Sequence, residues 1–115
     1  MNELVEAVLA FRDERDWRQF HNPKDLAISI SLEAAELLEH FQWKTAAEVE
    51  VAVQSGTERK AIGQEMADIL ILLISMSDAV GVDLIAAAKQ KLIENGRKYP
   101  VDRAKGNARK YDDLA

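Results

Sequence analysis

The sequence predicts an all-α protein, a bundle of four to five helices that assembles into oligomers. Apolar residues recur at helical spacing in several long segments. Helix-start signals precede these segments, and Gly81 and Pro100 stand where helices should end. No segment shows the alternation of apolar and polar residues that is typical of a half-buried strand. At 115 residues, the chain suits a single domain over residues 1–115.

The N-terminal part should form two helices joined by a loop. Residues 2–15 mix charged and apolar side chains at helical spacing, which predicts an amphipathic helix. Residues 16–21 break this period and are rich in rings, so we expect a loop there. Asn22 can cap the next helix, and Pro23 suits its first position because no N–H is needed there. That helix should run to about Gln42.

Capping-box spacings predict the next two helices. Thr45 and Glu48 open a short helix that should end near residue 55. The same spacing recurs from Ser55, before a long helix over residues 57–80. Beyond Asp68 the long helix is apolar nearly all round, more than a monomer of this size can surround. We therefore expect a homo-oligomer, a dimer or a tetramer, whose interface covers this helix.

The last predicted helix covers residues 84–98. Asp83 can cap it, and Pro100 prevents its extension. Residues 101–115 are polar and show no apolar period. We therefore expect an extended basic tail over residues 100–115.

Composition argues against several classes of protein. Hydrophobic residues make up 48% of the chain and charged residues 30%, which is typical of a soluble globular domain. The chain has no cysteine, which rules out disulfides and thiolate metal sites and fits a reducing compartment. The longest apolar run, residues 69–74, is too short to cross a membrane, and the acidic N-terminal residues are unlike a signal peptide. We expect a cytoplasmic protein without a membrane partner.

Charge is unevenly distributed along the chain. The net charge is −5, but residues 89–115 carry +4 and residues 1–88 carry −9. An acidic body argues against general binding of nucleic acid, which would need a dominating basic face. The pattern suits a small polyanion held by metal on one side and by Lys and Arg on the other.

Two acidic pairs lie inside the most apolar segments: Glu33 with Glu36, and Glu65 with Asp68. Residues three apart share one face of a helix, so each pair should point to one side. Four carboxylates facing a helical core would be very costly without a cation to neutralise them. Such oxygen ligands bind hard divalent cations, Mg²⁺ or Mn²⁺, which typically act on phosphates. We therefore interpret the four acids as one metal site between two packed helices.

Other interpretations of these residues stay open. A single Glu-x-x-Glu pair is most often a solvated stripe on an exposed helix face. Here, however, Ser29 and His40 extend the polar stripe along an otherwise apolar helix. A di-iron site would need Glu-x-x-His pairs, and neither His21 nor His40 has an acid three residues before it. The sequence contains no P-loop, no G-x-G-x-x-G and no motif that supports a Ser–His–Asp arrangement.

Longer motifs resemble a known family. Two stretches carry the resemblance first, Arg15-Asp-Trp-Arg-Gln-Phe-His-Asn-Pro23 and Glu33-Ala-Ala-Glu-Leu-Leu-Glu-His-Phe-Gln-Trp-Lys44. They resemble the MazG-like, all-α nucleoside triphosphate pyrophosphohydrolases, and most of all the branch of small dCTP pyrophosphatases. Glu65-Met-Ala-Asp68 resembles the second acidic half of that family. Asn95-Gly-Arg-Lys-Tyr-Pro-Val101 and Ala104-Lys-Gly-Asn-Ala-Arg-Lys-Tyr111 resemble its C-terminal end.

The resemblance implies hydrolysis of a nucleoside or deoxynucleoside triphosphate, dCTP-like, to the monophosphate and pyrophosphate with Mg²⁺. Such an enzyme would serve nucleotide-pool sanitation. The matching positions imply metal ligands and catalytic acids at Glu33, Glu36, Glu65 and Asp68, a base pocket at Trp17, His21 and Trp43, and phosphate binding at Lys91, Asn95, Lys98, Arg109 and Lys110. Relatives that resemble this chain assemble as tetramers with sites near subunit interfaces.

Each implied role has a structural alternative. Trp17 and Trp43 could fill a core or an interface, and Lys98 could interact favourably with the negative C-terminal end of the helix dipole. Leu72 departs from the animal enzymes of this branch, which carry a tyrosine there, so the preferred base and sugar stay open. The number of ions, the acid that positions the water and the choice between dimer and tetramer stay open too. The alternative function is a non-catalytic helical oligomer that binds nucleotide or a protein partner.

Overall fold

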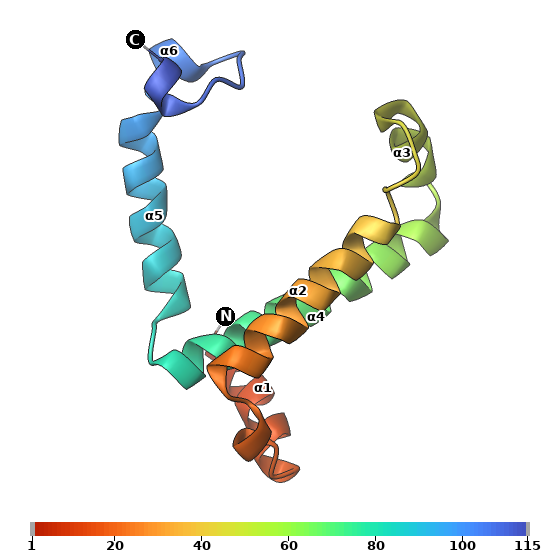
Figure 1. Cartoon of the computed structure of the whole chain (residues 1–115), viewed down its shortest axis with the longest axis vertical. Helices are drawn as coiled ribbons and strands as arrows, with labels where there is room; N and C mark the ends of the chain where they lie inside the picture. Colours follow the sequence, from red (N-terminus) through yellow and green to blue (C-terminus); the bar gives the residue numbers. More distant parts are fainter. Residues whose placement is uncertain (1, 115) are drawn as a thin grey trace. The chain divides into compact units, whose positions relative to one another are not determined.

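The computed structural model describes residues 2–114 and is all-α, as predicted (Figure 1). No strand occurs among these residues, which form six α-helices and two short 3-10 helices. Met1 and Ala115, the ends of the predicted domain and tail, lie outside the described residues. The elements follow one another as α1 (Asn2–Glu14), η1 (Arg18–Phe20), α2 (Pro23–Glu39), α3 (Ala46–Ala52), α4 (Gly56–Val80), α5 (Leu84–Lys98), α6 (Val101–Ala104) and η2 (Tyr111–Asp113).

Local capping explains several of the helix limits. The Asn22 side chain accepts a hydrogen bond of 2.9 Å from the Asp25 N–H at the start of α2. Thr45 and Glu48 form the predicted capping box before α3. Gly81 ends α4 with a φ of 71°, a left-handed conformation that glycine adopts without steric cost.

Two details of the helix limits differ from the sequence-based expectations. Ser55 precedes α4 but makes no capping hydrogen bond through its side chain. α2 ends at Glu39 rather than near Gln42, because the chain passes into turns after His40.

The expectation of an extended tail is also wrong for part of the C-terminal segment. Pro100 ends α5 as predicted, but it also stands at the N-cap of α6, where its missing N–H costs nothing. A further turn of 3-10 helix, η2, follows after the residues in between. Because these turns are only three or four residues long, they leave no apolar period in the sequence.

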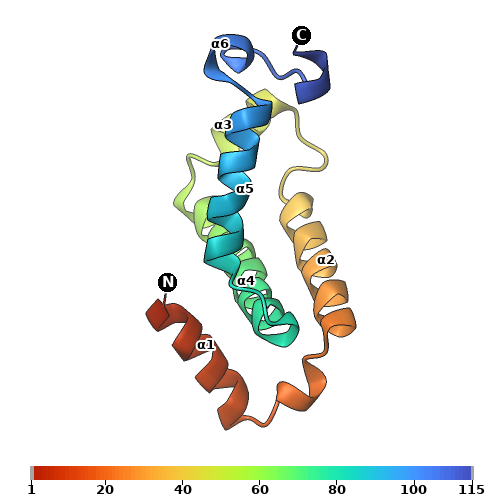
Figure 2. The same cartoon turned by 90° about the vertical axis from the view of Figure 1, so that its left-hand side faces the viewer.

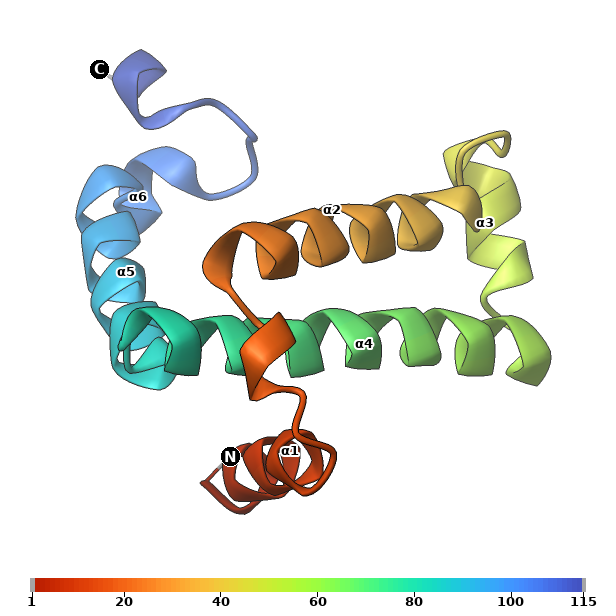
Figure 3. The ribbon, with the colours of Figure 1, turned by 60° about the horizontal axis from the view of Figure 1, so that its bottom comes forward.

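The described residues divide after Gly81 into two compact units. In the first unit, α2 and α4 lie side by side and run in opposite directions, and they make the largest helix–helix interface (Figures 1 and 3). α1 packs against α4 as well (Figure 2). The almost fully buried apolar side chains of this unit are Val8, Leu26 and Ile74.

Large apolar side chains on α2 and α4 stay accessible to solvent. Leu32 is 61% exposed on α2, and Met66 and Ile71 are 57% and 42% exposed on α4. The burial predicted for α4 is therefore not reached within one chain, and assembly into an oligomer stays a prediction. No single helix of the described part is both long and apolar enough to cross a membrane, although α4 and α5 taken together pass that test of length and composition.

One ion pair fastens α1 to α4. Arg12 is only 5% exposed, and its Nη1 donates a hydrogen bond of 2.6 Å to Asp78 Oδ2 on α4. Its Nε donates a second hydrogen bond of 2.9 Å to Asp13 Oδ1. A buried guanidinium needs such partners, because an unpaired charge away from water is costly.

We predict that Asp78→Ala destabilises the fold by about 2 kcal/mol, because it leaves the buried Arg12 guanidinium without its partner on α4. Urea unfolding at a fixed protein concentration measures the change. Asp13→Ala is the matched control and should cost less, because the Asp13 side chain is 55% exposed and lies on the same helix as Arg12. Equal losses in both variants would contradict this account.

Candidate functional site

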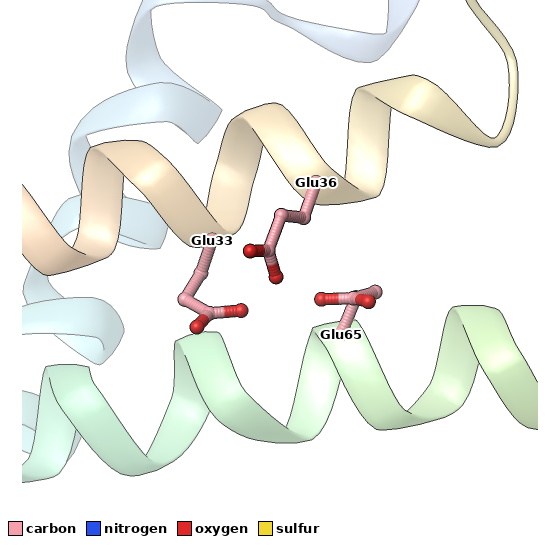
Figure 4. Close-up of side chains that lie close together, drawn as sticks. All are labelled: Glu33, Glu36 and Glu65. Carbon is pink, nitrogen blue, oxygen red and sulfur yellow. The ribbon is translucent and has the colours of Figure 1, made fainter.

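Three carboxylates meet in the space between α2 and α4 (Figure 4). Glu33 and Glu36 project from α2, and Glu65 projects from α4 toward them. One oxygen of each carboxylate lies within 4.8 Å of the other two. The spacing of three residues turns Glu33 and Glu36 to the same face of α2, and the packing of the two helices brings Glu65 opposite.

The crowding of these acids changes their protonation. The adjacent Glu36 carboxyl, partial burial and the charge of Asp68 raise the pKa of the Glu33 carboxyl to about 7. Partial burial also raises the pKa of the Glu65 carboxyl, and the hydrogen bond and charge of Glu36 add to this effect. The cluster therefore resists carrying its full negative charge at neutral pH.

The cluster fits a divalent cation. Glu33 Oε2 and Glu65 Oε2 are buried atoms without a hydrogen-bond partner in the structure. Buried polar oxygens without partners are rare and call for an explanation. Their all-oxygen environment is the kind that hard divalent cations prefer, and such a cation would satisfy both oxygens and offset the repulsion.

Asp68 does not join the group of three. Its carboxylate is not among the oxygens that lie within 4.8 Å of one another, although its charge raises the pKa of both Glu33 and Glu65. An aspartate side chain is one methylene shorter than a glutamate, so it reaches less far from α4.

The expectation of four acids inside a helical core is wrong for a single chain. Glu33 and Glu65 are half-buried, whereas Glu36 and Asp68 are exposed. Two antiparallel helices leave one edge of the cluster in contact with water. Glu36 and Asp68 lie at this edge, where hydration of their charged carboxylates is favourable.

His40 continues the polar seam of α2 toward α4. Its Nδ1 lies 3.7 Å from Glu58 Oε2, near the start of α4. The Lys44 ammonium donates a hydrogen bond of 2.8 Å to the His40 carbonyl oxygen. His40 is thus a link between the end of α2 and α4 rather than a member of the acidic cluster.

Trp17 and His21 lie on either side of η1. The Trp17 ring packs edge-on against Phe11, with centroids 5.8 Å apart, and lies 6.5 Å from the His21 ring. Asp16 takes a left-handed φ of 54°, and the Gln19 amide donates hydrogen bonds of 3.0 Å to its carbonyl and carboxylate oxygens. His21 Nδ1 is buried without a hydrogen-bond partner. The structure therefore brings these two predicted base-binding residues together.

Trp43 stands apart from that ring pair. It is 87% exposed in the turns after α2 and makes no ring contact within the described residues. It is thus no core residue in a single chain.

Leu72, the departure from the related enzymes, is half-buried one turn after Asp68 on α4.

The predicted phosphate-binding residues belong to the second unit. Lys91, Asn95 and Lys98 lie on α5, where the spacings of four and three residues place them on one face. Arg109 and Lys110 are exposed immediately before η2.

Two of these lysines make contacts that were not predicted from the sequence. Lys91 Nζ lies 3.6 Å from Glu94 Oε2, an i,i+3 pair that helical spacing could have revealed. The Lys98 ammonium lies over the Tyr111 ring, 4.8 Å from its centroid. That contact joins residues far apart in the sequence, so no local pattern could have indicated it.

Known proteins resemble this chain in sequence and in fold. The model of the MazG-like family matches residues 28–114, which include the four acids. Over 104 residues, the chain is 43% identical to dCTP pyrophosphatase 1 of Bos taurus and 41% identical to that of Homo sapiens. These matches cover 90% of this chain, which spans only 62% and 61% of the length of the two relatives.

A solved structure agrees with the sequence relatives. The crystal structure of a pyrophosphatase from Archaeoglobus fulgidus superposes with a TM-score of 0.79 at 43% sequence identity. The superposition covers 87% of this chain and 92% of that protein.

The raised pKa of Glu33 predicts that the metal-free protein loses stability as the pH rises. An ordinary glutamate pKa of 4.5 in the unfolded chain becomes about 7 in the fold, so the unfolded chain releases this proton first. The contribution is fully present below about pH 4.5 and is lost as the pH rises through about 7. Thermal melting in the presence of a chelator should therefore give a higher Tm at about pH 5.5 than at about pH 8.

Substitutions on one helix test the source of this pH dependence. Glu33→Gln should weaken it, with the raised pKa of Glu65 accounting for the remainder, whereas Glu39→Gln, an exposed position on α2 outside the cluster, should preserve it. Mg²⁺ competes with the proton, so it should raise the Tm more at about pH 8 than at about pH 6. An unchanged pH profile in Glu33→Gln would show that another group is responsible.

Proposed function

Because this chain belongs to the MazG-like family, we propose that it hydrolyses a nucleoside or deoxynucleoside triphosphate, such as dCTP, to the monophosphate and pyrophosphate. One observation carries the proposal. Glu33, Glu36 and Glu65 converge between α2 and α4 in a chain that is 43% identical to a dCTP pyrophosphatase over 104 residues.

We propose Mg²⁺ as the cofactor, with Mn²⁺ able to substitute. The glutamates of the cluster would hold it, and Asp68 would join them across the exposed edge. Support comes from the all-carboxylate ligand set and from the buried oxygens of Glu33 and Glu65 that lack partners. When bound, a divalent cation neutralises phosphate charge and makes water a better nucleophile.

The carboxylates and the cationic side chains of the chain would have complementary roles in this reaction. A carboxylate of the cluster accepts a proton from the attacking water, whose oxygen forms a bond to the α-phosphorus. The bond from that phosphorus to the oxygen that bridges to the β-phosphate breaks, and pyrophosphate leaves with the electron pair. Cationic side chains stabilise the charge on the leaving oxygens.

We assign the remaining predicted residues to substrate binding. The rings of Trp17, His21 and Trp43 would line the base pocket, because aromatic faces stack on nucleobases. The phosphates would be bound by Lys91, Asn95, Lys98, Arg109 and Lys110.

We propose further that the protein is a cytoplasmic homo-oligomer, a dimer or a tetramer, that serves nucleotide-pool sanitation. The exposed apolar side chains of α2 and α4 support an oligomer, because burying them against a second copy of the chain would stabilise the complex. Analytical ultracentrifugation measures the assembly directly.

Pyrophosphate release from a panel of common NTPs and dNTPs, with and without Mg²⁺, tests the activity. We expect metal-dependent release of pyrophosphate and not of orthophosphate, and the ranking of substrates gives the base and sugar preference. A preference for cytosine would show that Leu72 is compatible with it. No turnover across the panel would favour the alternative, a non-catalytic helical oligomer that binds nucleotide.

We predict that Glu36→Gln and Asp68→Asn each lower pyrophosphate release by about two orders of magnitude or more, because each removes a charged ligand. Circular dichroism should show unchanged helicity. Glu39→Gln, which removes the same charge from α2 outside the cluster, should retain activity. Activity retained in both Glu36→Gln and Asp68→Asn would disprove the assignment of the site.

A further inference from the structure

The C-terminal segment of the second unit folds back onto the end of α5. The ring of Tyr111, in η2, meets the ring of Tyr99 edge-on, with centroids 6.2 Å apart and an interplanar angle of 83°. Leu114 is 9% exposed, and the Arg103 guanidinium donates a hydrogen bond of 3.4 Å to its carbonyl oxygen. These contacts fix η2 and therefore fix the position of the Tyr111 ring.

The Lys98 ammonium lies over that ring. Its Nζ is 4.8 Å from the centroid of Tyr111, within the range of a cation–π interaction. The ring attracts the cation through its quadrupole but carries no net charge. Lys98 is therefore held in place without being neutralised.

The Lys98 charge is not neutralised within the part of the chain that the structure describes. Across residues 2–114 the Lys98 ammonium forms no ion pair, although Asp112 and Asp113 follow Tyr111 directly. Lys91 on the same helix differs, because Glu94 lies 3.6 Å from its ammonium. A phosphate that binds Lys98 consequently displaces no carboxylate of residues 2–114.

A fixed lysine binds an anion better than a mobile one. A free lysine side chain loses considerable rotamer entropy when an anion immobilises it. A side chain already restrained against a ring has lost part of that entropy before the anion arrives, which is the general advantage of preorganisation.

We propose that Tyr111 is a positioning residue that holds the Lys98 ammonium ready for a phosphate group of the substrate. The inference rests on the proposed function, in which Lys98 binds substrate phosphate. Tyr111 acts through its ring alone, since no hydrogen bond of its hydroxyl is needed for the contact with Lys98.

Steady-state kinetics of two variants test this role. Tyr111→Leu should raise the KM for the best triphosphate substrate about two- to five-fold, the range that an exposed cation–π contact supports, with kcat little changed. Tyr111→Phe keeps the ring and should retain the KM of the wild type. An unchanged or lower KM in Tyr111→Leu would overturn the inference, and so would an equal rise in Tyr111→Phe.

A double variant separates positioning from loss of structure. Lys98→Gln should raise KM by itself, and adding Tyr111→Leu should raise it no further, because both changes remove one interaction. Additive effects would show that Tyr111 acts independently of Lys98 and would overturn the proposal. The proton resonances of the Lys98 ε-methylene should show an upfield ring-current shift that disappears in Tyr111→Leu and persists in Tyr111→Phe.

The wild-type measurement distinguishes the two levels of the proposal. Absence of pyrophosphate release from the wild-type protein overturns the proposed function and this inference with it. Release by the wild type together with an unchanged KM in Tyr111→Leu overturns the inference alone.

Discussion

Electrostatic repulsion among Glu33, Glu36 and Glu65 is the constraint on which the rest of the first unit depends. The antiparallel packing of α2 and α4 forces these carboxylates together, and protons or a cation must offset their charge. Local signals set limits of these two helices: Asn22 begins α2 and Gly81 ends α4. The interface between α2 and α4 decides which carboxylates face one another.

The two units contribute opposite charge to the proposed chemistry. The first unit offers carboxylates with raised pKa values, which favour a bound cation. The second offers lysines and arginines on α5 and before η2, which favour phosphate. A nucleoside triphosphate complexed with a divalent cation presents a surface of both signs, so a chain with this division of charge suits such a ligand.

The limits of α5 were predictable from the sequence because capping is local. Asp83 and Pro100 bound α5 as expected, and Asp83 accepts the capping hydrogen bond from the Ala86 N–H at 3.0 Å. The brief turns of α6 and η2 were not predictable, since they are too short for an apolar period. The all-α fold and the resemblance to the MazG-like family are both confirmed.

The candidate site was only partly predictable. Spacing placed Glu33 and Glu36 on one face of a helix, but it could not show that Asp68 falls short of the group. That result depends on the reach of a side chain across an interface. The contact between Lys98 and Tyr111 depends on the path of the chain between α6 and η2. The spacing of residues in the sequence does not predict that path.

The contrast between the two tryptophans has a practical consequence. Trp17 is 43% exposed and packs against Phe11, whereas Trp43 is 87% exposed. These are the only two tryptophans in the chain, so its tryptophan fluorescence comes from one partly shielded and one hydrated indole. A variant that lacks one tryptophan reports the emission of the other alone. The surroundings of Trp17 and of Trp43 can therefore each be followed by fluorescence without an added dye.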